Sequence, residues 1–208
     1  MGAPISGFIA EPLGPQHDRA AFSCEIEPLE RYLKLQANQD LRKDLSVTYV
    51  LVPVENRSRI AGYYTLCADT IPIDDLPLEM VKKLRLPHYN SIPATLIARL
   101  ARDSSYKGAG VGELLFTSAL KLACETSRRI ASWAVTVDAK NEKARRFYLD
   151  FGFISFADTE RRLYLPMRTI EQLLARQPSG AWSTQSRNSQ ASAQALPGDY
   201  LGECKDAR

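Results

Sequence analysis

The sequence is poor in the residues that build metal sites and disulfide frameworks. It has two histidines and four widely spaced cysteines without a Cys-x-x-Cys pair: Cys24, Cys67, Cys124 and Cys204. Because zinc sites need closely spaced Cys and His ligands, we expect no metal ion. No apolar run reaches the roughly 18 to 20 residues of a membrane-spanning helix, and no secretory signal is visible at the N-terminus. We therefore expect a cytoplasmic protein with reduced thiols and no membrane partner.

An excess of one charge is also missing. The chain carries 27 basic and 24 acidic side chains, a net charge of +3, which by itself does not indicate a nucleic-acid-binding protein. Its 208 residues fit one domain with an appendage. The composition changes near Gln177, after which Ser, Gln, Ala, Gly and Pro dominate and little apolar surface can be buried. We predict a domain over residues 1–176 and a flexible polar tail over residues 177–208.

Hydrophobic periodicity predicts alternating strands and helices within the domain. Helices are expected over 29–45, 78–84, 112–126, 141–151 and 170–176, and strands over 47–54, 60–71, 92–102, 130–138, 153–156 and 161–166. The first two strands form a hairpin across the turn at 56–59, whereas helices separate the later ones. This order predicts an α/β (α+β) fold with a mixed sheet on which the helices pack.

A glycine-rich loop stands between the strand predicted over 92–102 and the helix that follows it. Its sequence is Lys107-Gly108-Ala109-Gly110-Val111-Gly112. Glycines at alternate positions let consecutive amide hydrogens converge on one anion, and the helix adds the positive end of its dipole. With the charge of Lys107 at its rim, the loop is suited to a pyrophosphate.

Three other kinds of loop have related sequences. A P-loop is rejected because Glu113 follows the last glycine where a lysine is required. A dinucleotide-binding Rossmann site shares the order strand, loop, helix, strand, with Asp138 ending the second strand, but its glycines are spaced G-x-G-x-x-G. A glycine-rich turn without a ligand is the third alternative.

Two motifs resemble those of one enzyme family. Residues 102–112 resemble the acetyl-CoA signature of the GNAT N-acetyltransferases, Gln/Arg-x-x-Gly-x-Gly/Ala, with Lys107 in the first position. Residues 141–153 are similar to the family's second cofactor helix, which carries an Asn, an Ala, a Tyr and a terminal Gly-Phe. The resemblance implies a GNAT fold, a mostly antiparallel mixed sheet with helices on both faces, and acetyl-CoA as the cofactor.

The resemblance narrows to the GNAT toxins of bacterial type II toxin–antitoxin systems and covers about residues 11 to 170. It rests on the segments 13–18, 22–24, 29–33, 97–101, 137–140 and 163–167. The sequence departs from these toxins at Glu25, where they usually have Gly, at Arg102, where they usually have Val, and in its long polar tail. The resemblance implies the α-amino group of aminoacyl-tRNA as the acceptor, a small ribbon-helix-helix antitoxin as a partner, and possible homodimers.

Family resemblance also assigns roles to residues. The backbone of Leu100, Ala101 and Arg102 would pair with the pantetheine arm, and one strand amide would face the thioester oxygen. The pyrophosphate would be held by Lys107, Gly108, Gly110, Val111 and Gly112. Asn141 and Ala144 would flank the pantetheine from the second helix.

Tyr148 is the predicted general acid, because a phenol is protonated at pH 7 and can donate to a leaving thiolate. The alternative is a core aromatic residue, since Ala144, Phe147, Tyr148 and Phe151 have the i, i+3, i+4, i+7 spacing of a buried helix face. A general base is not evident. His17 and His88 are candidates, although an α-amine of pKa about 8 needs none.

Arg99 and Arg102 are the cationic residues most relevant to an RNA acceptor, because both interrupt an otherwise apolar strand. We predict that they share one face of that strand and that Arg99 meets the RNA end or the antitoxin. Two other functions stay open. One is acetylation of a small amine or a protein N-terminus, with acidic residues supplied from Asp69, Asp74, Asp75 and Glu79. The other is a non-catalytic acetyl-CoA-binding module.

Overall fold

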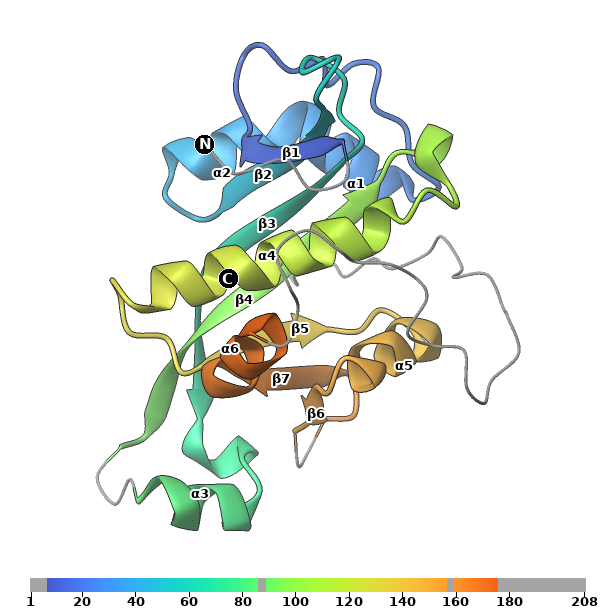
Figure 1. Ribbon diagram of the computed structural model, residues 1–208. Coiled ribbons are helices and arrows are strands. Elements are labelled where there is room, and N and C mark those ends of the chain that lie inside the picture. The colour runs from blue at the N-terminus through green and yellow to red at the C-terminus, as the bar shows by residue number, and fades with distance from the viewer. Residues whose placement is uncertain (1–6, 86–88, 157–158, 176–208) are drawn as a thin grey trace.

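The protein folds around one seven-stranded sheet (Figure 1). The computed structural model describes residues 7–85, 89–156 and 159–175. The strands are β1 (Phe8–Pro12), β2 (Val47–Pro53), β3 (Gly62–Pro72), β4 (Ser91–Arg102), β5 (Ala134–Asp138), β6 (Ile154–Ser155) and β7 (Arg162–Pro166), in the order β1-β2-β3-β4-β5-β7-β6. Among the described strands, β4 and β5 are the one parallel pair. The predicted mixed, mostly antiparallel sheet is therefore confirmed.

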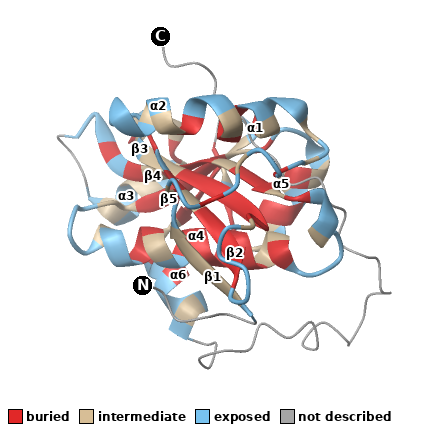
Figure 2. Ribbon diagram, turned by 90° about the horizontal axis from the view of Figure 1, so that it is seen from above, coloured by how far each residue is buried: buried red, intermediate tan, exposed pale blue. Residues whose placement is uncertain are grey.

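Helices cover both faces of the sheet (Figure 2). They are α1 (Glu27–Arg31), α2 (Ala37–Arg42), α3 (Leu78–Leu84), α4 (Val111–Ser127), α5 (Glu142–Asp150) and α6 (Met167–Ala175). One hydrophobic core joins α4, α5 and α6 to the sheet, and a second joins α1 to the opposite face. A third, smaller core packs beside α3. None of the described helices is long and apolar enough to cross a membrane.

The structure differs from the sequence-based elements in several places, of which the last helix, beginning at Met167 rather than at residue 170, is one. The sequence does not predict strand β1, because Glu11 and Pro12 interrupt its short apolar pattern. These residues form a strand because they pair with β2. The helix expected over 29–45 starts at Glu27 and contains a π-helical turn at Tyr32–Gln36 before α2. Strand β5 starts at Ala134 rather than at residue 130, where Ile130 is 74% exposed.

The parallel strands β4 and β5 separate along their length. Their described pairing joins Ala94 with Ala134, Thr95 with Val135 and Leu96 with Thr136. Strand β4 then continues to Arg102 beside β3, while β5 ends at Asp138. The half of β4 that follows Leu96 therefore has no described pairing with β5, and we call it the open half of β4.

Candidate active site

The open half of β4 offers a strand edge to which an extended ligand can add. Leu100, Ala101 and Arg102 all lie in the half of β4 that pairs with β3 but has no described partner on β5. Unpaired backbone N–H and C=O groups at a strand edge can bind a chain that adds to the sheet. The structure therefore brings the three predicted pantetheine-binding residues to one edge.

The glycine loop adopts a conformation that only glycine tolerates well. Gly108 and Gly110 have φ angles of +80° and +73°, and Gly110 is the N-cap of the 17-residue helix α4. A Cβ atom added at Gly108, Gly110 or Gly112 would meet nothing within 4 Å. Bare backbone amides at a helix N-terminus, with open space before them, fit the pyrophosphate of an acyl-CoA. A Rossmann site is excluded, because the sheet is mostly antiparallel.

Lys107 is held by an acidic residue from the N-terminal segment. Its Nζ lies 2.8 Å from Oε1 of Glu25, and the two side chains are 63% and 39% exposed. The pair is therefore solvent-exposed and can be exchanged for another anion at modest cost. Glu25, which stands where the GNAT toxins usually have Gly, thus contacts the glycine loop directly.

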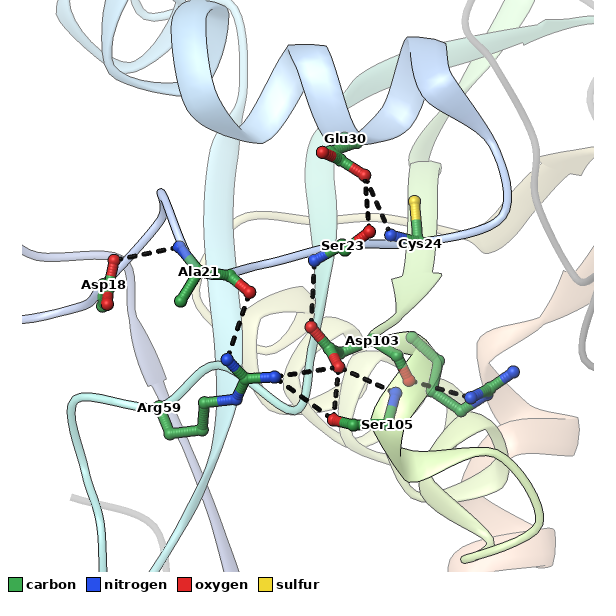
Figure 3. A network of polar contacts seen from close by, with 9 residues as sticks. Asp18, Ala21, Ser23, Cys24, Glu30, Arg59, Asp103 and Ser105 are labelled. Atoms are coloured by element: carbon green, nitrogen blue, oxygen red, sulfur yellow. Dashed lines mark hydrogen bonds and ion pairs between the residues drawn. The ribbon is translucent and has the colours of Figure 1, made fainter.

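Asp103 anchors this loop and was not singled out from the sequence (Figure 3). Its carboxylate, 1% exposed as a residue, accepts hydrogen bonds from the Ser23 amide (3.0 Å), the Ser105 amide (2.9 Å) and Arg59 Nη2 (3.2 Å). The amide of Ser104 donates to the Ser23 carbonyl at 2.8 Å. The loop is thus fixed to both the N-terminal segment and the β2–β3 turn. An Asp before two serines at the end of a strand was the available signal.

Asn141 caps the second cofactor helix. Its side-chain oxygen accepts a hydrogen bond from the Ala144 amide at 2.9 Å, and Ala144 is 1% exposed. The side-chain nitrogen of an Asn in this position is still able to donate to a ligand. Helix α5 therefore starts at a fixed point beside the end of β5.

Tyr148 is buried within an aromatic cluster on α5. Its ring centroid lies 5.6 Å from that of Phe116 and 5.6 Å from that of Phe153, and the residue is 3% exposed. Burial, and to a smaller extent the charge of Asp138, raises the pKa of Tyr148 well above its ordinary value. Tyr148 therefore lies on the buried face of α5, as the interpretation as a core aromatic residue predicts. It also keeps its proton at neutral pH, as the role of general acid requires.

The structure describes one of the two candidate bases, His17, whose ring is engaged in the fold. His17 is 4% exposed, its Nδ1 accepts from the Gly14 amide at 2.8 Å, and its Nε2 lies 2.9 Å from Glu11. Both ring nitrogens are thus used to hold the N-terminal segment. His88 lies outside the described residues.

Two of the four acidic residues considered for a small-amine site are engaged elsewhere. Asp69 binds Arg162 Nη2 at 3.0 and 2.8 Å and accepts from the Thr136 hydroxyl. Glu79 pairs with Lys82 at 3.2 Å. The Asp69 carboxylate can receive an incoming ammonium group only with the loss of these bonds, whereas the Glu79–Lys82 pair is solvent-exposed and contributes little. Among the described residues, no cluster of three or more His, Cys, Asp or Glu side chains could hold a metal ion.

The prediction that Arg99 and Arg102 share a face is wrong. The guanidinium carbon of Arg99 lies 3.7 Å from the Tyr32 ring centroid, on the face where Ala101 joins the core beneath α1. Leu100 packs in the opposite core, beneath α4. Because strand residues alternate between faces, residues three apart lie on opposite sides, and Arg102 falls with Leu100. Arg102 Nη1 donates to the Asp103 carbonyl at 2.8 Å.

The pairing of β4 with β5 ends early, and a glycine loop then leads into the N-terminus of α4. Together these features are typical of enzymes that hold an extended, phosphate-bearing cofactor along a strand. Comparison with family models identifies the family. The chain belongs to the acetyltransferase (GNAT) family, whose model matches residues 16–153. It has the GNAT fold and is an acetyltransferase with acetyl-CoA as the acetyl donor.

Two curated relatives are similar to nearly the whole domain. "Probable toxin TacT" of Sinorhizobium fredii is 33% identical over 80% of this chain and 94% of its own length. A "tRNA-acetylating toxin" of Mycobacterium tuberculosis is 26% identical over 82% of this chain and 99% of its own.

Solved structures of toxins are similar as well. AtaT complexed with acetyl-methionyl-tRNAfMet is 29% identical, with a TM-score of 0.72 over 80% of this chain and 99% of that one. A Tyr-to-Phe mutant of AtaT bound to acetyl-CoA and the C-terminus of the antitoxin AtaR is 27% identical. Its TM-score is 0.66 over 81% of this chain and 98% of that one.

Proposed function

We propose that this protein transfers the acetyl group of acetyl-CoA to the α-amino group of aminoacyl-tRNA and so blocks translation. The observation that carries the proposal is the similarity over the whole domain to a toxin in complex with an acetylated aminoacyl-tRNA. An acetylated α-amine has lost the lone pair that attacks a peptidyl ester. The charged tRNA is then unable to extend a peptide.

The chain's own residues supply binding, orientation and a proton. Leu100, Ala101 and Arg102 hold the pantetheine arm along β4, with Asn141 and Ala144 on its other side. Lys107, Gly108, Gly110, Val111 and Gly112 hold the pyrophosphate. When bound, acetyl-CoA would supply the acetyl thioester, and a backbone amide of the open half of β4 would stabilise the charge that develops on the thioester oxygen.

Tyr148 completes the reaction as the general acid. Its raised pKa keeps the phenol protonated, so it can donate to the departing thiolate. No protein base is needed, because an α-amine of pKa about 8 has a useful neutral fraction at pH 7. The engagement of both nitrogens of His17 in the fold agrees with this assignment.

We further propose a small ribbon-helix-helix antitoxin as the protein partner, a homodimer as the assembly, and the cytoplasm as the location. The complex of AtaT with the C-terminus of AtaR supports an antitoxin. Charged tRNA as the acceptor supports a cytoplasmic site of action. The bonds that join Asp69 to Arg162 argue against this carboxylate as the ligand of a small amine.

The test is acetyl transfer from labelled acetyl-CoA to a mixed pool of charged tRNAs. We expect label on the tRNA, and a loss of about 100-fold or more in Tyr148→Phe with acetyl-CoA binding retained. The matched control is Tyr164→Phe, which removes another buried phenol whose oxygen has no described hydrogen-bond partner. Acetyl-CoA binding without transfer to tRNA contradicts the proposed acceptor. Absence of acetyl-CoA binding contradicts the role of the glycine loop.

A further inference from the structure

Arg99 is a half-buried cation without an anionic partner in the described part of the chain. Five other described arginines are partly buried. Arg59, Arg145 and Arg162, with side chains 23 to 30% exposed, each pair with a carboxylate. Arg102 donates to the Asp103 carbonyl, and Arg19 has no described carboxylate contact. The described contact of the Arg99 side chain is instead with the ring of Tyr32. Because a charge partly removed from water is normally paired, the structure leaves the guanidinium of Arg99 available to an external anion.

Tyr32 fixes the position of this guanidinium. The residue is 2% exposed, its hydroxyl lies 3.0 Å from Ser46 Oγ, and its ring stacks on Tyr63 with an interplanar angle of 20°. A guanidinium stacked on an immobile ring keeps its N–H donors at the edge, in one plane. Tyr32 also opens the π-helical turn at Tyr32–Gln36, an irregularity that is frequent at functional sites.

A second unpartnered polar group lies opposite Arg99. Thr65 pairs with Arg99 in the β3–β4 register, and its buried hydroxyl oxygen has no hydrogen-bond partner among the described residues. The register shifts here, so that Ala98 is the extra residue of a β-bulge. Bulges are over-represented next to active sites, where they redirect a side chain. Arg99, Thr65 and the bulge all adjoin the open half of β4.

We propose that Arg99 binds the phosphate of the acceptor's terminal nucleotide and so selects aminoacyl-tRNA over other amines. The assignment rests on the proposed function. A planar guanidinium donates two parallel hydrogen bonds to a phosphate. In aminoacyl-tRNA the anion nearest to the α-amine is the 5′-phosphate of the terminal adenosine, whereas a protein N-terminus or a simple amine carries no such group.

The experiment compares two small acceptors that differ in this phosphate alone: 3′-O-aminoacyl-adenosine and the same ester of adenosine 5′-monophosphate. The quantity measured is the ratio of their kcat/KM values. We expect wild-type protein to favour the phosphorylated ester, and Arg99→Gln to lower that ratio about 10- to 100-fold, because a hydrogen bond to a charged group is lost. Arg99→Lys, which keeps the charge without the planar fork, should give an intermediate ratio.

Arg31→Gln is the matched control, since it removes an exposed cation from α1 and should leave the ratio unchanged. An unchanged ratio in Arg99→Gln, or an equal fall in Arg31→Gln, would overturn the proposal. Acetyl-CoA binding by each variant verifies folding. Failure of wild-type protein to acetylate either ester or charged tRNA would instead contradict the proposed function, before any Arg99 variant is made.

Discussion

Tyr148 owes its protonation state to its surroundings. Burial among Phe116, Phe147 and Phe153 disfavours the phenolate, and the nearby charge of Asp138 disfavours it further. The spacing of aromatic residues on α5 could not separate a core residue from an acid, because both fit a buried helix face. The structure shows that Tyr148 is a core residue with a raised pKa, which is compatible with the proposed role of general acid.

This pKa shift predicts the pH dependence of the reaction. As pH rises, kcat/KM for aminoacyl-tRNA should increase while the acceptor amine deprotonates near about pH 8, and then stay level to about pH 10. It stays level because the raised pKa of Tyr148 keeps the acid protonated there. Rate measurements from pH 6 to pH 10 give the profile. A descending limb between pH 8 and pH 10 would show that the acid ionises in its ordinary range.

His17 belongs to the fold rather than to catalysis. Burial alone would raise the pKa of Glu11, but hydrogen bonds from Arg57 and His17 lower it overall. A lowered carboxyl pKa stabilises the fold above the unfolded-state value, and that stability is lost as pH falls through the folded-state value.

We expect His17→Ala to lower the free energy of unfolding by about 1–3 kcal/mol, because the Gly14 amide and Glu11 lose a buried partner. The rate–pH profile should keep its shape. Urea titration measures the first quantity and steady-state kinetics the second. A lost ascending limb in the rate profile would restore His17 as a base.

At the element scale, two glycines of the loop allow the effect of backbone strain to be measured separately from the effect on ligand binding. Gly110 has φ +73°, so an alanine there strains the backbone. Gly112 has no such angle and open space around its Cα. We expect Gly112→Ala to leave Tm almost unchanged and to weaken acetyl-CoA binding at least about 10-fold, because the new methyl group enters the space facing the amides. Calorimetry measures both. Unchanged binding would place the pyrophosphate elsewhere.

The Glu25 carboxylate competes with the cofactor's pyrophosphate for Lys107 of the same loop. This carboxylate holds Lys107 where the cofactor's pyrophosphate is expected, so Glu25→Gln should tighten acetyl-CoA binding about 2- to 5-fold. The gain should shrink at high salt, since the pair is exposed. Glu27→Gln, at the exposed start of α1, is the control. Weaker binding in Glu25→Gln would mean that the residue supports the loop.

At the scale of the whole molecule, the domain boundary is still a prediction. Residues 177–208 lie outside the described residues, and the boundary at residue 176 rests on composition. A chain that ends at residue 176 should keep the Tm and the acetyl-CoA Kd of the full chain, because α6 completes the apolar core with Met167 and Ile170. Thermal melting and calorimetry measure these values. A lower Tm or weaker binding would assign the tail to the domain.

Much of the architecture could be predicted because its signals are local. The glycine loop and the amphipathic pattern placed α4 within one residue of each end, and the apolar run placed β4 equally well. Strand β1 could not be predicted from its local sequence, because its five residues form a strand only through pairing with β2. The Arg99–Arg102 relation was predicted wrongly, although strand alternation alone puts residues three apart on opposite faces.

The sequence by itself determined the glycine loop, the helix that begins near Asn141 and the family, because each depends on residues within a few positions of one another. The tertiary structure alone decided which half of β4 stays open, that Lys107 faces Glu25 82 positions away, and that Arg99 rests on Tyr32. It also decided the pKa of Tyr148. These properties depend on strand pairing and burial between segments distant in the chain, and no local pattern records which distant segments will meet.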